Sequence, residues 1–288
     1  MAPDVKKTLI TGGQSMMAGY LKKVYGKQAV CLTRAELDIS LHESLYSLLE
    51  TGRFDTLINC AGAASADRET LFNINALYPA NIAEVCGKLG VRFVMLSSAR
   101  IFDGCKESPY VESDFPSPVD DYGLSKYAGE KFVENILYDG TFYVFRAPMV
   151  LGFRQRHPEA QLVTRLLEYC RSDNRIQVAE DVITSVVYAG DAAVKIKECL
   201  NRRLPSGIYH ITSGQSVNLY NIMCRVVAEL DLPVDVVPSH SGKFTNGKRI
   251  SRFISLGTEI LSLCHDWEET VRCFAIDYVN RSVCHVAK

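Results

Sequence analysis

Short apolar runs that alternate with helical patterns constrain the fold of this chain more than any other feature. The runs in about the first 150 residues are rich in Val, Ile, Leu or Phe, and the stretches between them repeat apolar residues three and four apart. Strands covered on both faces have this continuous apolar character. The alternation predicts βαβ units and a parallel sheet. The expected strands are Lys7–Thr11, Ala29–Leu32, Thr56–Asn59, Phe93–Leu96 and Phe142–Phe145, with helices at Ala76–Leu89 and Tyr122–Leu137.

The pattern becomes less regular after Gly152. Gly207–Ile211 reads as a strand that returns to the main sheet, and Ser239–Lys248 is polar and contains glycine, which predicts a mobile loop. We therefore expect an α/β fold, a doubly wound parallel sheet with a smaller C-terminal lobe. The other expected elements are helices at Ala160–Cys170, Asp191–Leu200, Leu219–Leu230 and Glu268–Tyr278, and a strand at Arg175–Val178.

Composition excludes several classes of protein. With 47% hydrophobic and 23% charged residues, the chain is neither disordered nor collagen-like. A net charge of −1 gives no overall attraction to nucleic acid or to an anionic membrane. Without a long apolar run or a signal-peptide core, we expect a cytoplasmic protein. The cysteines form no Cys-x-x-Cys motif and read as buried thiols; because only the pairs Cys264–His265 and Cys284–His285 favour zinc, no metal is expected.

A turn that contains glycine follows the first strand. Dinucleotide-binding folds need such a turn, because the backbone must approach a pyrophosphate closely at the N-terminus of the next helix. Read from Gly12, this turn is Gly-x-x-Ser-x-x-Ala, with Ser15 and Ala18 in place of the second and third glycines of a common pattern. Both substitutes are small, so the turn can form. An ordinary βα turn without a ligand is the alternative.

Residues after the next two strands also favour a nucleotide. Asn59–Ala63 closes the third strand with small residues, as a backbone that lies against a nucleotide requires. Asp38 is placed to accept a hydrogen bond from an adenine amino group. Arg34 is either a partner for a 2′-phosphate, which would favour NADPH, or a solvated surface residue. The cofactor is therefore NADP(H) or NAD(H).

Tyr122 and Lys126 are the candidate acid and its helper. Residues four apart share a helix face, so both side chains point to one side. A phenol has a pKa of about 10, and a nearby cation favours its ionised form. Ser98, at the end of the fourth strand, is a third group that could hold a substrate carbonyl oxygen. The pair alone is a common accident and could face solvent, but the trio predicts proton transfer to a carbonyl.

Several stretches together resemble one family. Within the extended short-chain dehydrogenases, the chain resembles the dTDP-4-dehydrorhamnose reductase family over about Lys7 to Leu261. The matching stretches are Arg34–Ile39, Asp55–Ala61, Asn75–Asn81, Leu96–Ser98, Ile101–Gly104, Tyr122–Lys126, Ser185–Asp191 and Gly207–His210.

The resemblance implies NAD(P)H-dependent reduction of a 4-keto group on a nucleotide-activated deoxysugar, as in deoxysugar biosynthesis. Residues 1–152 and about 186–212 would form a Rossmann-like NAD(P)-binding domain; 153–185 and 213–288 would form the substrate-binding lobe. Tyr122 would be the proton donor, Lys126 would bind the nicotinamide ribose and Ser98 would polarise the ketone. A homodimer is a possible assembly. The implied cofactor-binding residues are Gly12, Gln14, Ser15, Met16, Met17, Arg34, Asp38, Ile39, Ala61, Gly62, Ala63, Tyr122 and Lys126.

The chain departs from the family near the substrate. It has Ala99 and Arg100 where the family has Asp and Tyr, and Met149 where an aromatic residue is usual. The expected substrate-binding residues are Ser98, Ala99, Arg100 and Met149, with Arg100 either on a diphosphate or exposed. The sugar stays open. Two alternatives remain: an NAD-dependent nucleotide-sugar epimerase, and a catalytically lapsed regulatory subunit that resembles the β subunit of methionine adenosyltransferase.

Overall fold

The computed structural model describes residues 7–64, 66–153, 163, 166–168, 174–245, 247 and 249–286, with side chains as far as residue 281. Its contacts divide the chain into two compact units. The first unit comprises Met1–Ile101, Pro116–Arg146 and Ala193–Tyr209, and the second comprises Phe102–Phe115, Ala147–Ala192 and His210–Lys288. The second unit therefore includes Phe102–Phe115, a segment that the domain division drawn from the sequence kept in the first domain. That division into a cofactor domain and a substrate lobe stays a prediction.

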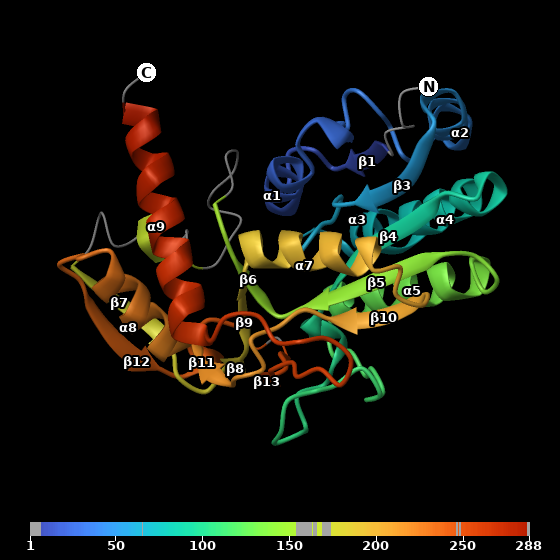
Figure 1. Cartoon of the computed structure of the whole chain (residues 1–288). Helices are drawn as coiled ribbons and strands as arrows, with labels where there is room; N and C mark the ends of the chain where they lie inside the picture. The colour runs from blue at the N-terminus through green and yellow to red at the C-terminus, as the bar shows by residue number, and fades with distance from the viewer. Residues whose placement is uncertain are drawn as a thin grey trace. The chain divides into compact units, whose positions relative to one another are not determined.

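The first unit is built on a six-stranded sheet with the order β10-β5-β4-β3-β1-β2 (Figure 1). β1 pairs in parallel with β2 and β3, and β3 pairs in parallel with β4. The sheet confirms the predicted α/β class and the return of the strand near residue 207. The strands are β1 (Lys7–Thr11), β2 (Ala29–Cys31), β3 (Phe54–Asn59), β4 (Arg92–Ser98), β5 (Phe142–Ala147) and β10 (Gly207–His210).

Helices cover both faces of this sheet, as a doubly wound fold requires. On one face, α2 (His42–Gly52), α4 (Tyr78–Leu89) and α5 (Asp121–Ile136) pack into one core with apolar side chains of the strands. On the other face, α1 (Met16–Tyr25) meets α7 (Ala189–Asn201), where the Nζ of Lys197 donates to the carbonyl oxygen of Val24 at 2.8 Å (Figure 1).

The helix predicted from Ala76 begins differently in the structure. α3 (Arg68–Phe72) continues into a π-helical turn at Asn73–Leu77, and the regular α4 begins only at Tyr78, with Pro79 in its first turn. Pro79 has no backbone N–H, so it cannot make the regular helical hydrogen bond to the preceding turn, and the regular ladder is interrupted at this point. The π turn buries Asn75 completely. Turns of this kind are frequent at functional sites.

The second unit has short strands and two long helices. β6 (Met149–Leu151) pairs with β9 (Val186–Tyr188), and β7 (Arg175–Ala179) pairs with β12 (Asp235–Ser239), both in parallel. A core that includes Val178, Val226 and Phe274 lies among them. The remaining elements are β8 (Ile183–Thr184), β11 (Val217–Asn218), β13 (Phe253–Ile254), α8 (Leu219–Glu229), α9 (Trp267–Val286) and the 3-10 turn Ser241–Lys243.

Two predicted elements fall partly outside the described residues. Of the expected helix Ala160–Cys170, the structure describes residue 163 and residues 166–168, all helical. The expected loop Ser239–Lys248 is described except for residues 246 and 248, and it contains the 3-10 turn.

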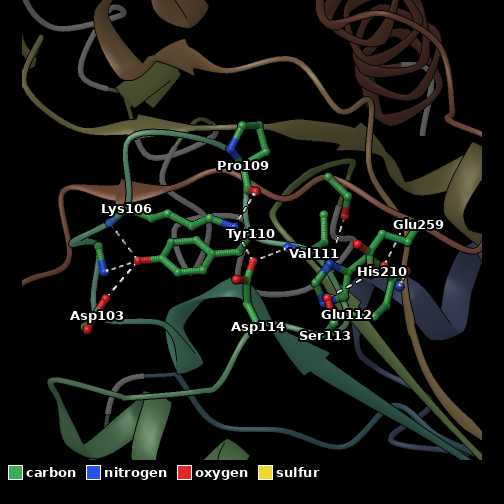
Figure 2. Close-up of polar contacts among 12 residues, drawn as sticks. Asp103, Lys106, Pro109, Tyr110, Val111, Glu112, Ser113, Asp114, His210 and Glu259 are labelled. Carbon is green, nitrogen blue, oxygen red and sulfur yellow. Dashed lines mark hydrogen bonds and ion pairs between the residues drawn. The ribbon is translucent and has the colours of Figure 1, made fainter.

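The segment Phe102–Phe115 is held in the second unit by ring stacking and by polar contacts (Figure 2). The ring of Tyr110 stacks on Phe102 with centroids 4.2 Å apart, and its hydroxyl donates to Asp103 at 2.8 Å. Figure 2 also shows the Glu112 carboxylate beside His210, whose backbone N–H donates to it at 2.9 Å. These contacts fix the chain between β4 and α5.

Two general findings concern metals and membranes. Within the part of the chain that the structure describes, no three His, Cys, Asp or Glu side chains gather as a metal site would need. His265 instead lies 2.9 Å from the Asp191 carboxylate, while the side chains of Cys284 and His285 lie outside the described residues. No described helix is both long and apolar enough to cross a bilayer.

Candidate functional site

The turn after β1 requires glycine at its first position. Gly12 has φ +67°, in the left-handed region, and a Cβ added there would lie 2.4 Å from the backbone nitrogen of Ala61. Any side chain would therefore collide with a neighbouring backbone. Ser15 follows as the N-cap of α1, and its hydroxyl accepts a hydrogen bond from the Ala18 N–H at 3.3 Å. The first turn of α1 thus follows directly after a turn whose first residue, Gly12, has no side chain.

The end of β3 lies against this turn. The Asn59 side-chain oxygen accepts from the Thr11 hydroxyl at 2.8 Å and from the Ala61 N–H at 3.1 Å. This bridge holds the small residues Ala61–Ala63 beside the Gly12 backbone. A surface of backbone and small side chains at the carboxyl edge of a parallel sheet is where such folds bind nucleotides. The close packing of Gly12 fits a dinucleotide cradle.

Asn75 connects this loop to α5. Its side-chain oxygen accepts from the Ala63 N–H at 3.1 Å, and its amide donates to the Ala63 carbonyl at 2.8 Å and to the Ser125 hydroxyl at 3.0 Å. The Ser125 hydroxyl in turn donates to the Tyr122 carbonyl at 2.8 Å. Asn75 was not predicted as a site residue. An asparagine among apolar residues, directly before the predicted helix Ala76–Leu89, was the signal available in the sequence.

Tyr122 is the second residue of α5, and Ser98 is the last residue of β4. The Ser98 hydroxyl lies close enough to the Tyr122 phenol to lower the pKa of that phenol. Ser98 also accepts from the backbone N–H of Arg100 at 3.3 Å, so its own proton remains available for donation. The predicted pair of hydroxyls is therefore brought together.

Close packing fixes the start of α5. Asp120 caps the helix by accepting from the Gly123 N–H at 2.8 Å. A Cβ on Gly123 would lie 2.1 Å from the carbonyl oxygen of Arg100, so only glycine lets the helix lie this close to the turn at Ala99–Ile101. This approach sets the position of Tyr122 relative to Ser98.

Lys126 lies one helical turn after Tyr122 and is 7% exposed. Its Nζ donates to the Leu96 carbonyl at 3.1 Å and lies 3.2 Å from the position that a Cβ on Gly62 would take. It therefore reaches the carboxyl edges of β3 and β4. Burial lowers the pKa of Lys126 to about 8, against the opposing effect of the Glu130 charge.

A buried ion pair lies one helical turn after Lys126 on α5. Glu130, one turn further along α5, is fully buried and pairs with Arg146 of β5 through contacts of 2.7, 3.1 and 3.2 Å. A buried carboxylate is tolerated only with such a partner. Neither residue was predicted from the sequence, because they are 16 positions apart on different elements.

The electrostatics of Tyr122 differ from the sequence argument. Burial raises the pKa of the Tyr122 phenol, the Ser98 hydroxyl and the Arg100 guanidinium lower it, and the Asp120 carboxylate raises it. From the sequence, we expected Lys126 to be the neighbouring cation. In the structure, the cation that lies over the phenol ring is Arg100, with its Cζ 4.8 Å from the ring centroid.

The remaining predicted residues are placed as follows. Asp38 accepts from the Ser40 hydroxyl at 2.7 Å and from its N–H at 3.0 Å, and these bonds lower the pKa of Asp38. Ile39 is buried in the core, so only its backbone is open to a ligand. Ala99 is buried in the turn after β4, and Met149 begins β6 of the second unit. Gln14 and Arg34 are exposed, and Met16 and Met17 are half-buried in the first turn of α1.

The low pKa of Lys126 makes a prediction about stability. Between about pH 8 and the pKa of an unfolded lysine near 10.4, the unfolded chain binds a proton at this lysine that the folded protein does not bind. The free energy of unfolding therefore increases as the pH rises through this range. Relative to Lys126→Met, the wild type should gain about 2 kcal/mol in free energy of unfolding between pH 7 and pH 10. Urea titrations at a series of pH values measure this. The matched control is Lys131→Met, an exposed lysine of the same helix. Because the hydrogen bond to Glu134 raises the pKa of Lys131, the stability of the wild type relative to this variant should not rise over this range. A Lys126 difference that does not rise either would contradict the assignment.

The match to a protein family covers almost the whole chain. A family model described as "RmlD substrate binding domain" matches residues 6–270. The dTDP-4-keto-6-deoxy-D-glucose reductase of Streptomyces niveus is 29% identical over 259 residues, covering 86% of this chain and 88% of that protein. The dTDP-4-dehydrorhamnose reductase of Burkholderia thailandensis is 28% identical over 238 residues, covering 77% of this chain and 78% of that protein.

Solved structures have the same fold. The crystal structure of dTDP-4-dehydrorhamnose reductase from Bacillus anthracis, in complex with NADP, superposes with a TM-score of 0.86 at 22% identity. The superposition covers 94% of this chain and 99% of that one.

Proposed function

Because the chain belongs to the family of the RmlD substrate binding domain, we propose that it is an NAD(P)H-dependent reductase of a 4-keto group on a nucleotide-activated deoxysugar. The two relatives described above carry names of reductases that act on such sugars, which supports the reaction class. NADP in the solved relative supports the cofactor class.

One observation carries the proposal: Tyr122 of α5 lies near Ser98 at the end of β4, and Lys126 of the same helix reaches the loop that packs against the Gly12 turn. Ser98 is near enough to lower the pKa of Tyr122, and Lys126 lies against Gly62 in the loop that Asn59 holds beside Gly12. A ketone oxygen placed between the Ser98 hydroxyl and the Tyr122 phenol would receive a hydrogen bond from each of them. Such a pair stabilises the negative charge that develops on that oxygen.

Each side chain then has a separate role. Tyr122 donates its proton to the ketone oxygen, and Ser98 holds that oxygen in place. Lys126 binds the nicotinamide ribose, and its donation to the Leu96 carbonyl holds the long side chain at this edge. A bound reduced nicotinamide supplies the hydride. The residues that would hold the dinucleotide are those of the Gly12 turn, the Ala61–Ala63 loop, Arg34 and the Asp38–Ile39 segment.

The identity of the sugar depends on residues that differ from the family. Ala99 and Arg100 are proposed to shape the substrate site together with Ser98, and Met149 stays a predicted substrate-binding residue. We also propose a cytoplasmic location and a homodimer, both of which the sequence led us to expect.

The direct test mixes the purified protein with NADPH and a 4-keto-6-deoxy nucleotide sugar. Absorbance at 340 nm should fall with one NADPH consumed per sugar reduced. Conversion of the sugar without net consumption of NADPH would indicate an epimerase. Binding of NADPH without any turnover, across several nucleotide sugars, would indicate a lapsed enzyme with a binding role.

Ser15 takes the place of the second glycine of the common turn pattern, and this difference leads to a prediction about cofactor affinity. Ser15→Gly should leave the Kd for NADPH unchanged or lower it, because the hydroxyl and Cβ lie near the expected pyrophosphate. The lost cap should cost only roughly a few tenths of a kcal/mol, as glycine is itself a tolerated N-cap. Isothermal titration with NADPH measures the affinity. Marked weakening would mean that the Ser15 hydroxyl itself contacts the cofactor.

A further inference from the structure

Arg100 occupies a position that the proposed roles leave unexplained. Its guanidinium lies over the ring of Tyr122, with Cζ 4.8 Å from the centroid, and its Nη2 pairs with the Asp120 carboxylate. The side chain of Arg100 is 39% exposed and that of Asp120 is 21% exposed. A cation at this distance from an aromatic face is attracted to it, more strongly when partly desolvated.

The surrounding backbone holds this arrangement in place. Asp120 uses one carboxylate oxygen to cap α5 at Gly123 and the other to bind Arg100. Gly123 lets the helix pack directly on the carbonyl oxygen of Arg100. The backbone N–H of Arg100 donates to Ser98. The turn that follows Ser98 and the start of α5 therefore connect the Ser98 hydroxyl, the Arg100 guanidinium and the Tyr122 phenol.

Arg100 also carries the more dependable charge. A guanidinium stays protonated at every pH at which proteins fold. Lys126 is buried, has a pKa lowered to about 8, and donates to the Leu96 carbonyl. The charged and titratable groups around the phenol are Arg100 and Asp120 beside it and Lys126 one turn along α5; the ion pair of Arg68 with Asp121 lies at the same helix end.

We propose that Arg100 is a positioning residue that acts through Tyr122: held by Asp120, it keeps the phenol oriented toward Ser98 and places a permanent positive charge over the ring. This inference rests on the proposed function, in which Tyr122 is the proton donor. As hydride from NAD(P)H adds to the carbonyl carbon, the phenol O–H bond breaks and an alcohol O–H bond forms. The phenolate that remains is stabilised by the Arg100 charge.

The first test measures the ionisation of Tyr122 without any substrate. Protein labelled with ¹³C at the tyrosine ζ carbon is titrated by NMR, and Tyr122→Phe identifies the resonance. Arg100→Gln removes the charge and should raise the pKa of Tyr122 by about one unit, since a cation at this distance shifts a neighbouring group by that order. Arg100→Lys should restore part of the shift.

The matched control is Arg68→Gln. Arg68 pairs with Asp121 at the start of the same helix, but its side chain is 74% exposed and it does not lie over the ring. This variant should leave the titration of Tyr122 unchanged. An unchanged titration in Arg100→Gln, with the fold intact by circular dichroism, would overturn the proposal.

Kinetics provide the second readout. Arg100→Gln should lower kcat for ketone reduction by up to about tenfold, the limit for a rise of one unit in the pKa of the proton donor, with little change in KM. A raised KM with unchanged kcat and an unmoved titration would make Arg100 a substrate ligand and also overturn the proposal. If the wild type reduces no nucleotide sugar, the proposed function fails, while the NMR titration still decides the effect of Arg100 on Tyr122.

Discussion

Tyr122→Phe is expected to lower kcat for ketone reduction by on the order of 100-fold or more. The change removes one oxygen atom and the proton that it carries, and leaves the ring under Arg100. The Ser98 hydroxyl remains, so the ketone oxygen keeps one hydrogen bond. Because the phenol does not contribute to the Gly12 turn, the Kd for NADPH should stay nearly the same.

Steady-state kinetics and fluorescence titration with NADPH check the two halves of this prediction. The matched control is Tyr127→Phe, in the same helix, whose half-buried ring lies near Lys131. It should keep the wild-type kcat. A Tyr122→Phe enzyme with more than about half of the wild-type kcat would remove Tyr122 from the chemistry.

Gly12→Ala should produce the largest loss of cofactor binding. The new Cβ would lie 2.4 Å from the Ala61 nitrogen and 2.7 Å from the Cys60 carbonyl carbon, and the backbone would also keep a φ of +67°. The left-handed conformation alone costs an alanine roughly 1–2 kcal/mol. The loop would have to move away from the turn, so we expect the Kd for NADPH to rise at least about tenfold, which corresponds to about 1.4 kcal/mol.

Gly19→Ala is the control for this substitution. Gly19 lies in α1, and a Cβ there would meet no atom within 4 Å. Alanine is favoured over glycine inside a helix by up to about 1 kcal/mol, so this variant should melt at the same temperature or higher and bind NADPH normally. Normal NADPH binding by Gly12→Ala would show that the turn is not the cofactor cradle.

The sheet was predictable because its signal is local. Strands buried on both faces are short apolar runs, and β1 was predicted with its observed ends while β2 was predicted one residue too long. The helix of Tyr122 and Lys126 was likewise evident from spacing alone. The π turn before α4 was not, because its apolar spacing resembles that of a regular helix.

The pairings within the site could not be predicted, since each joins residues far apart in the chain. Asn75 meets Ser125 across 50 positions, and Arg100 meets Asp120 across 20. An isolated arginine in a sequence reads equally well as a surface residue or a ligand, as Arg100 did. Only the fold shows that its charge is directed at Tyr122.

Transfer of a labelled hydride tests the central claim most directly. The protein is incubated with NADPH that carries deuterium in the transferable position and with a 4-keto-6-deoxy nucleotide sugar, and the product is analysed by NMR and mass spectrometry. We predict one deuterium on the former carbonyl carbon, on a single face, and almost none with Tyr122→Phe over the same time. A sugar that is recovered unreduced, or altered without deuterium, would contradict the assignment of this protein as a ketone reductase.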